Sequence, residues 1–69
     1  MKLYTALIYN YNGEYGPFYH EKEFLASDKK EADRLGRKWC AEQNALDMYY
    51  AEKAGMKPIT YYYDGTTES

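Results

Sequence analysis

Three kinds of residue in this sequence could do chemistry: its only histidine, its only cysteine and an unusually large number of tyrosines. His20 lies in a segment that alternates like a strand, with Glu21 beside it. A general base needs a positioned partner and a substrate pocket, and neighbouring residues of a strand point to opposite faces. We therefore interpret His20 as a half-exposed strand residue and predict that the protein is not an enzyme, with no catalytic residue.

Cys40 follows Trp39 in a segment with helical spacing. A reactive thiolate needs a helix N-terminus or cationic neighbours. Arg37 and Lys38 are close in sequence, but Cys40 borders the apolar side of the segment, which favours core packing. A lone cysteine forms no intramolecular disulfide and no Cys-rich zinc site, and it fits a reducing cytoplasm. The sequence predicts neither a metal nor a cofactor.

A basic flank is the next candidate. Its residues share one side of the predicted helix: Lys30, Arg34, Arg37 and Lys38. Such a flank could bind phosphates or an acidic protein surface, although Glu31 and Asp33 interleave with it and a solvated face is the commoner outcome. Lys and Arg number nine against eleven Asp and Glu, for a net charge of −2. DNA-binding domains usually carry a basic excess, so direct nucleic-acid binding is the alternative rather than the leading hypothesis.

The ten tyrosines are the main anomaly of the composition. A domain this small can hide roughly half of them, and the others must display their rings. Tyrosine is enriched in protein–protein hot spots, whereas base stacking usually accompanies a basic groove. The alternative is that most tyrosines substitute for missing aliphatic core residues. The candidate protein-binding residues are Tyr11, Tyr15, Tyr19, Tyr61, Tyr62 and Tyr63.

The length and composition predict one small folded domain. The chain has 69 residues, no valine, two isoleucines and five leucines. So few aliphatic residues would favour disorder only with a large net charge. Here the aromatic residues can take their place, because each removes about 150–250 Å² from water when buried. We assign residues 1–64 to the domain and residues 65–69 to a polar C-terminal tail.

Two antiparallel strands are predicted at the N-terminus. Residues 3–11 alternate two largely apolar faces, which favours a strand that is central in its sheet. Asn12-Gly13 is typical of a hairpin turn, and Gly16-Pro17 lengthens the connection to residues 12–17. Residues 18–25 then form the return strand, and its charged centre, residues 21–23, suits an exposed edge.

One helix follows the hairpin. Asp28 and Glu31 have capping-box spacing, with Ser27 as an alternative cap, and Ala32, Leu35 and Trp39 share the apolar face together with Gly36 and Gln43. Residues 45–54 leave two alternatives. Either the helix continues to a left-handed cap at Gly55, or it ends at Asn44 and a strand follows. Residues 59–63 form the last strand in both cases, and Asp64-Gly65 ends it.

The predicted architecture is therefore α+β: a small antiparallel sheet with one helix packed on one face, made of a β-hairpin, the helix and one or two returning strands. An exposed strand edge or a tyrosine face could also support a homodimer. The N-terminus lacks the features of a signal peptide, and no stretch is apolar enough to span a membrane. We expect a cytoplasmic protein that binds no membrane.

This layout, with the segment EFLASDKKEADRLGRKW entering the helix, resembles small proteins encoded by phages and mobile elements, in particular the anti-CRISPR proteins. The resemblance implies a stoichiometric inhibitor in a bacterial host. It would dock on a CRISPR effector, a protein or ribonucleoprotein complex, and block target-DNA binding or nuclease recruitment. The layout also resembles the three-stranded DNA-binding domains of phage-type integrases. Those domains carry basic sheets, whereas this sheet carries mainly Tyr and Glu.

Overall fold

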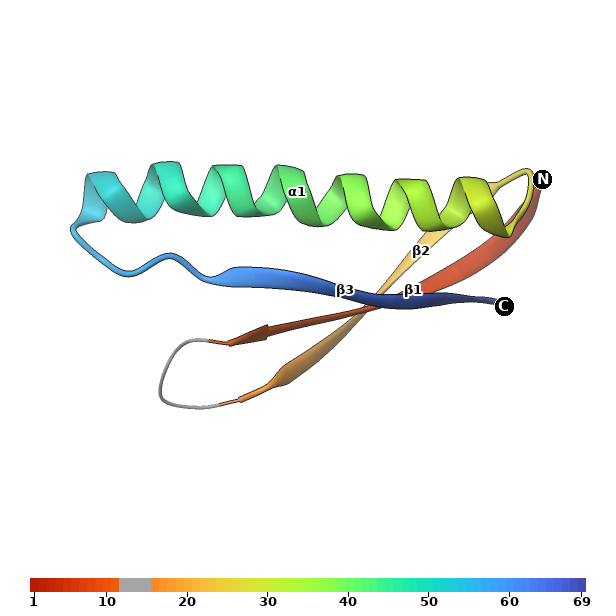
Figure 1. Ribbon diagram of the computed structural model, residues 1–69, viewed down its shortest axis with the longest axis horizontal. Coiled ribbons are helices and arrows are strands. Elements are labelled where there is room, and N and C mark those ends of the chain that lie inside the picture. Colours follow the sequence, from red (N-terminus) through yellow and green to blue (C-terminus); the bar gives the residue numbers. More distant parts are fainter. Residues whose placement is uncertain (12–15) are drawn as a thin grey trace.

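The computed structural model describes residues 1–11 and 16–69, with only the backbone of Tyr11. The elements are β1 (Lys2–Tyr11), β2 (Phe18–Ala26), α1 (Lys29–Ala54) and β3 (Thr60–Glu68). The strands form an antiparallel sheet in the order β2-β1-β3, and α1 lies across one face of it (Figure 1). The predicted α+β architecture and the central place of the first strand are confirmed. The predicted Asn12-Gly13 turn lies outside the described residues.

The alternation along β1 assigns its two faces. Tyr4, Ala6, Ile8 and Asn10 are buried, whereas the residues between them are only partly buried or exposed. Since successive side chains of a strand point to opposite sides, the even-numbered residues face α1. The register with β2 pairs Ala6 with Lys22 and Leu7 with Glu21. The odd-numbered residues of both strands therefore share the face that points away from the helix.

The N-terminus of α1 is capped as its sequence indicates. Asp28 is the N-cap, and its carboxylate accepts a hydrogen bond from the Glu31 backbone N–H at 2.8 Å. The Glu31 carboxylate does not complete the predicted box on Asp28. It accepts instead from the Ser27 hydroxyl at 2.6 Å. Both Ser27 and Asp28 therefore take part in the helix start, one through Glu31 and the other directly.

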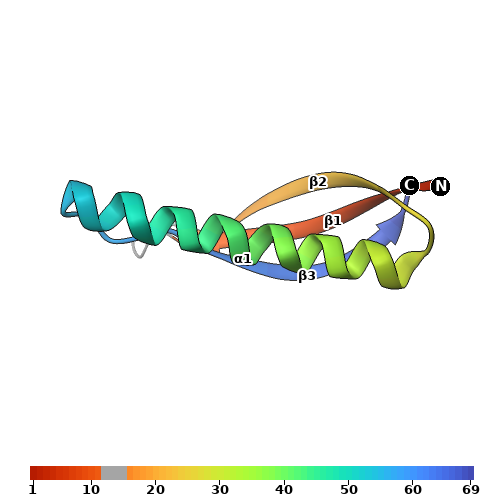
Figure 2. The same ribbon diagram turned by 90° about the horizontal axis from the view of Figure 1, so that it is seen from above.

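The helix continues through the ambiguous segment, so the alternative of a strand at residues 45–54 is wrong. Gly55 has a φ of 69°, and the N–H groups of Gly55 and Met56 bond back to the carbonyls of Glu52 and Ala51. This pattern is a Schellman cap. At 26 residues α1 is about 39 Å long, close to the 42 Å length of the whole molecule. Figure 2 shows the helix running obliquely over the strands.

The core is built mainly from small residues rather than from tyrosines. The largest fully buried side chain is Ile8, which clusters with Ala6 and Cys40, and a second buried cluster joins Tyr4 to Ala26 and Ala32. Trp39, Tyr61 and Tyr63 pack against this core but stay partly exposed. Gly36 allows α1 to approach β3 closely. A Cβ at this position would lie only 2.6 Å from the Tyr63 ring. The helix thus approaches the sheet closely through a stripe of small side chains.

The last strand is longer than predicted, since it runs to Glu68 instead of ending at Asp64-Gly65. Gly65 has a φ of 113°, and the pairing with β1 shifts register between Ala6 and Ile8. The glycine thus forms a bulge, after which pairing with β1 resumes. Thr66 is buried and Glu68 forms an ion pair with Lys2 at 3.5 Å. Residues 65–68, predicted as a tail, are therefore part of the sheet.

Candidate functional site

The surroundings of His20 and Cys40 favour structural roles for both residues. His20 lies on β2, where its Nε2 donates a hydrogen bond to the Asn10 side-chain oxygen at 2.5 Å. Its partner is an amide, which cannot act as a proton relay. Cys40 is buried, and burial raises the pKa of its thiol above the ordinary value. A raised pKa disfavours the nucleophilic thiolate at neutral pH, so the predicted packing role of Cys40 is the one its surroundings support.

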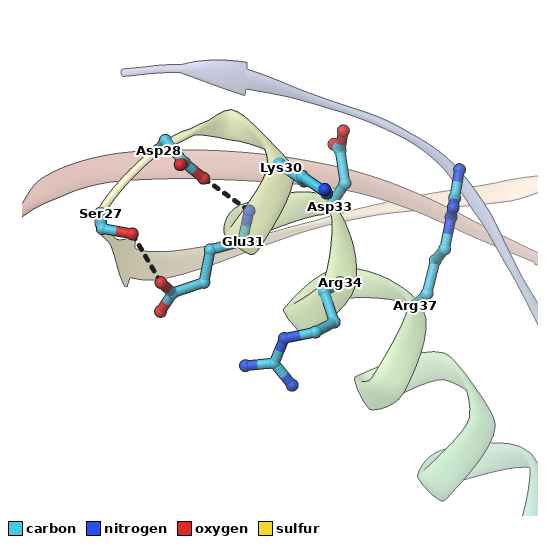
Figure 3. Close-up of a pocket in the computed structure, with 7 residues that line it drawn as sticks. All are labelled: Ser27, Asp28, Lys30, Glu31, Asp33, Arg34 and Arg37. Atoms are coloured by element: carbon cyan, nitrogen blue, oxygen red, sulfur yellow. Dashed lines mark hydrogen bonds between the residues drawn. The ribbon is translucent and has the colours of Figure 1, made fainter.

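The basic flank is only partly brought together. Lys30, Arg34 and Arg37 line a hollow of about 620 Å³ at the N-terminal end of α1, but Asp28, Glu31 and Asp33 line it too. Figure 3 shows Arg37 directed toward β3 and Arg34 pointing away from the strands. The Arg37 guanidinium lies 5.3 Å from the centre of the Tyr63 ring. Lys38 lies outside this hollow and pairs with Glu42 at 3.8 Å.

Three tyrosines form a ladder across the sheet face that points away from α1, which we call the open face. Tyr9 on β1 is paired in register with Tyr19 on β2 and with Tyr62 on β3. The Tyr9 and Tyr62 rings stack with their centres 5.1 Å apart, and the Tyr9 and Tyr19 rings are tilted at 6.0 Å. Tyr19 is 61% exposed and Tyr62 44%. The ladder presents a rigid aromatic surface to solvent.

Carboxylates border this ladder. The register places Glu21 and Glu23 on the open face, opposite Leu7 and Thr5 of β1, and Asp64 follows the bulged stretch of β3. A hollow of about 410 Å³ lies beside Gly65, with Glu21 and Asp64 among its lining residues. Lys29 reaches its rim, but the Lys29 ammonium lies 3.1 Å from the carboxylate of Asp33.

The open face is therefore acidic as well as aromatic. All nine Lys and Arg residues of the chain lie within the part that the structure describes. Lys2 and Lys22, the two basic residues on strands, occupy even positions and so face the helix side. Exposed leucines extend the surface at its far end, where Leu3 pairs with Leu25. The open face thus combines rings, carboxylates and leucines.

The other predicted tyrosines have different places. Tyr61 and Tyr63 face the helix and are partly buried, and burial raises the pKa of both phenols. The Tyr63 hydroxyl donates to Asp33 at 2.5 Å and also contacts Thr66. Tyr15 and the side chain of Tyr11 lie outside the described residues. Of the six candidates, Tyr19 and Tyr62 are therefore the ones that the structure places on the open face.

The site residues predicted from the sequence did not include four members of this surface: Tyr9, Glu21, Glu23 and Asp64. A signal for them was present, because the alternation in residues 3–11 and 18–25 already separates odd from even positions. The alternation did not reveal on which of these two faces the helix packs. That choice depends on Ala6 and Ala26, which are small enough to let α1 approach.

Among residues 1–11 and 16–69, no group of three or more His, Cys, Asp and Glu residues is placed to hold a metal ion. Within the same residues, α1 does not have the length of apolar sequence that crossing a membrane requires. Comparison with protein-family models, curated proteins and solved structures gives no match to this chain. The surface of the protein is therefore the basis on which its function can be inferred.

Proposed function

We propose that this protein is a non-enzymatic binding module that docks on another protein through its open face. The observation that carries the proposal is the ladder of Tyr9, Tyr19 and Tyr62, stacked across three paired strands. Tyrosine offers a large contact area with few rotatable bonds, so little conformational entropy is lost on binding. Stacking and strand pairing hold the rings in place before the partner arrives, which lowers that cost further.

The charge of the open face indicates the kind of partner. Glu21, Glu23 and Asp64 lie together on one side of the ladder, and the basic side chains of the strands lie on the opposite face. Charged groups across an interface are arranged so that their potentials complement each other. The partner surface is therefore cationic, and arginine fits best because its planar group both stacks on tyrosine and forms paired hydrogen bonds with carboxylates.

A cationic partner surface agrees with the inhibitor role that the resemblance to anti-CRISPR proteins implies. A complex that binds target DNA presents Lys and Arg to the phosphate backbone. An aromatic and acidic face that covers such a surface would exclude DNA by occupancy alone, with one inhibitor per site. In this proposal the protein acts in the cytoplasm of a bacterial host, against a defence complex, and needs neither a cofactor nor a catalytic residue.

The test has two stages. Tagged protein first captures its partner from a bacterial lysate, with nuclease treatment and washes at low and high salt. The purified partner is then titrated by calorimetry with Tyr19→Ala and Tyr62→Ala, and with Tyr50→Ala as the control, since Tyr50 is exposed on α1 and lies outside the open face.

Each substitution on the open face should raise Kd about thirtyfold, which corresponds to about 2 kcal/mol at a hot spot. Their melting temperatures should fall only slightly, because each variant loses one cross-strand ring contact with Tyr9, worth about 0.2–1 kcal/mol. Equal affinity of all three variants for the captured partner would refute the role of the open face.

Nucleic-acid binding by the basic flank is the second candidate, favoured by the presence of Lys30, Arg34 and Arg37 along one hollow. It predicts binding to single-stranded or duplex DNA that weakens steeply as salt rises. Arg34→Ala is the informative variant, because Arg37 also contacts Tyr63. Fluorescence anisotropy at about 50 mM salt decides the matter, and undetectable binding there ends this hypothesis.

A further inference from the structure

A second apolar surface lies on the C-terminal half of α1, on the side that points away from the sheet. Leu46 is 47% exposed, Met48 62%, Tyr49 53% and Tyr50 62%. The inward side of the same turns carries Asn44, which bonds to the backbone of Tyr61, and the buried Ala51. Successive residues of a helix are about 100° apart, so Leu46 and Tyr49 share this outward side, whereas Met48 and Tyr50 lie on its two flanks. Exposed apolar side chains that lie together are of the kind that marks interaction sites, and we call Leu46 and Tyr49 the helix patch.

Charged residues at both ends of the helix patch indicate what covers it. Glu42 precedes the patch and Lys53 follows it, and their spacing from Leu46 and Tyr49 places all four on one helical stripe. We propose that the helix patch binds a second copy of this chain, with the two helices antiparallel. A two-fold axis between residues 47 and 48 sets Glu42 opposite Lys53 of the other copy, and Leu46 opposite its Tyr49.

The symmetry makes each of these contacts occur twice, as it does in most homodimers. A parallel arrangement in register would instead set Glu42 against Glu42 and Lys53 against Lys53. Both charged side chains are free to exchange partners. Glu42 now contacts Lys38 at 3.8 Å with its side chain 58% exposed, and Lys53 lies over the Tyr49 ring at 4.6 Å.

The small size of the contact between the two helices predicts a weak dimer. In this register residues 41–54 of the two helices overlap, a length of about 20 Å. The area is smaller than the roughly 800 Å² per partner of a standard stable interface. The dimer is therefore weak, with a Kd on the order of 100 μM, and it assembles only as the protein concentration rises. This surface is separate from the open face, so the inference does not depend on the proposed function.

Sedimentation equilibrium from about 10 μM to about 1 mM tests the dimer directly. Wild-type protein should change from monomer to dimer over this range, whereas Leu46→Glu and Tyr49→Glu should stay monomeric and keep their helical circular dichroism. Leu25→Glu is the matched control, since Leu25 is 61% exposed on the open face, and it should dimerise like the wild type. A wild type that is monomeric throughout, or a dimer lost in Leu25→Glu and kept in Leu46→Glu, overturns the proposal.

Charge reversal tests the antiparallel pairing. Glu42→Lys and Lys53→Glu should each raise the dimer Kd about three- to tenfold, because each reversal breaks two exposed ion pairs. The double variant recreates both pairs with their signs exchanged, so its Kd should return close to the wild-type value. A double variant that dimerises as weakly as the single variants overturns the proposed arrangement.

Discussion

Gly36 is the residue on which the contact between helix and sheet depends most directly. An alanine there would favour the helix by about 1 kcal/mol, but its Cβ would lie 2.6 Å from the Tyr63 ring. That ring cannot move aside easily, because Asp33 and Thr66 hold its hydroxyl. We expect Gly36→Ala to lower the free energy of unfolding by about 1–3 kcal/mol, the usual cost of overpacking. Urea unfolding measures the change, and a gain in stability would show that the ring yields freely.

Tyr63 also makes the free energy of unfolding depend on pH in the alkaline range. Its pKa is raised from 10.0, first by burial and then by the hydrogen bond to the Asp33 carboxylate. Since the folded state holds the phenol proton more tightly than the unfolded state, this stabilisation is present below about pH 10 and is lost as pH rises through the raised pKa. We expect the unfolding free energy of the wild type to fall as the pH rises above about 10, and that of Tyr63→Phe to fall less steeply. Equal slopes in the two proteins would contradict this role.

The hydrogen bond between Tyr63 and Asp33 also makes the free energy of unfolding depend on pH in the acidic range. The hydrogen bond from Tyr63, followed by that from Lys29, lowers the pKa of Asp33 below 3.8. A lowered pKa stabilises the folded state above the pKa of the unfolded chain, and this contribution is lost as pH falls through the folded value. One contact between α1 and β3 therefore contributes to both the acid and the alkaline limits of stability.

At the scale of the elements, the helix shows what local sequence can and cannot predict. Its start was predictable because Asp28 and Glu31 carry a capping signal that acts within one turn. Its end was not predictable, because asparagine, the residue at position 44, is common in left-handed caps. In addition, Leu46, Met48 and Tyr50 alternate as the residues of a strand do. The structure resolves this through a distant contact. The Asn44 side chain accepts from the Tyr61 N–H at 2.6 Å and donates to its carbonyl at 3.0 Å.

The third strand illustrates the same limit. Asp64-Gly65 is a good turn signal locally, yet β3 continues to Glu68 because β1 offers pairing partners on the far side of the bulge. The membership of the open face was hidden for a related reason. Alternation separates Tyr9 and Glu21 from Ala6 and Lys22, but only the packing of α1 decides which set faces solvent. Both errors concern contacts between residues far apart in the sequence.

At the scale of the whole molecule, the fold sorts charges that the composition averages away. The net charge of −2 indicates no preferred partner, yet Glu21, Glu23 and Asp64 share the open face while the basic residues of the strands face the other way. A molecule sorted in this way attracts a cationic surface to one side only. Such attraction acts mainly on the association rate and is screened by salt.

This sorting predicts how charge removal affects binding to the captured partner. The double variant Glu21→Gln/Glu23→Gln should associate several-fold more slowly at low salt, and its rate should change less with ionic strength than the wild-type rate. Its dissociation rate should change little, because the tyrosine ladder remains. Glu31→Gln/Glu52→Gln is the matched control, since it removes the same charge from α1, away from the open face. Biosensor kinetics at low and high salt compare the three proteins. If both double variants slow association equally, the partner senses only the net charge, and the open face has no steering role.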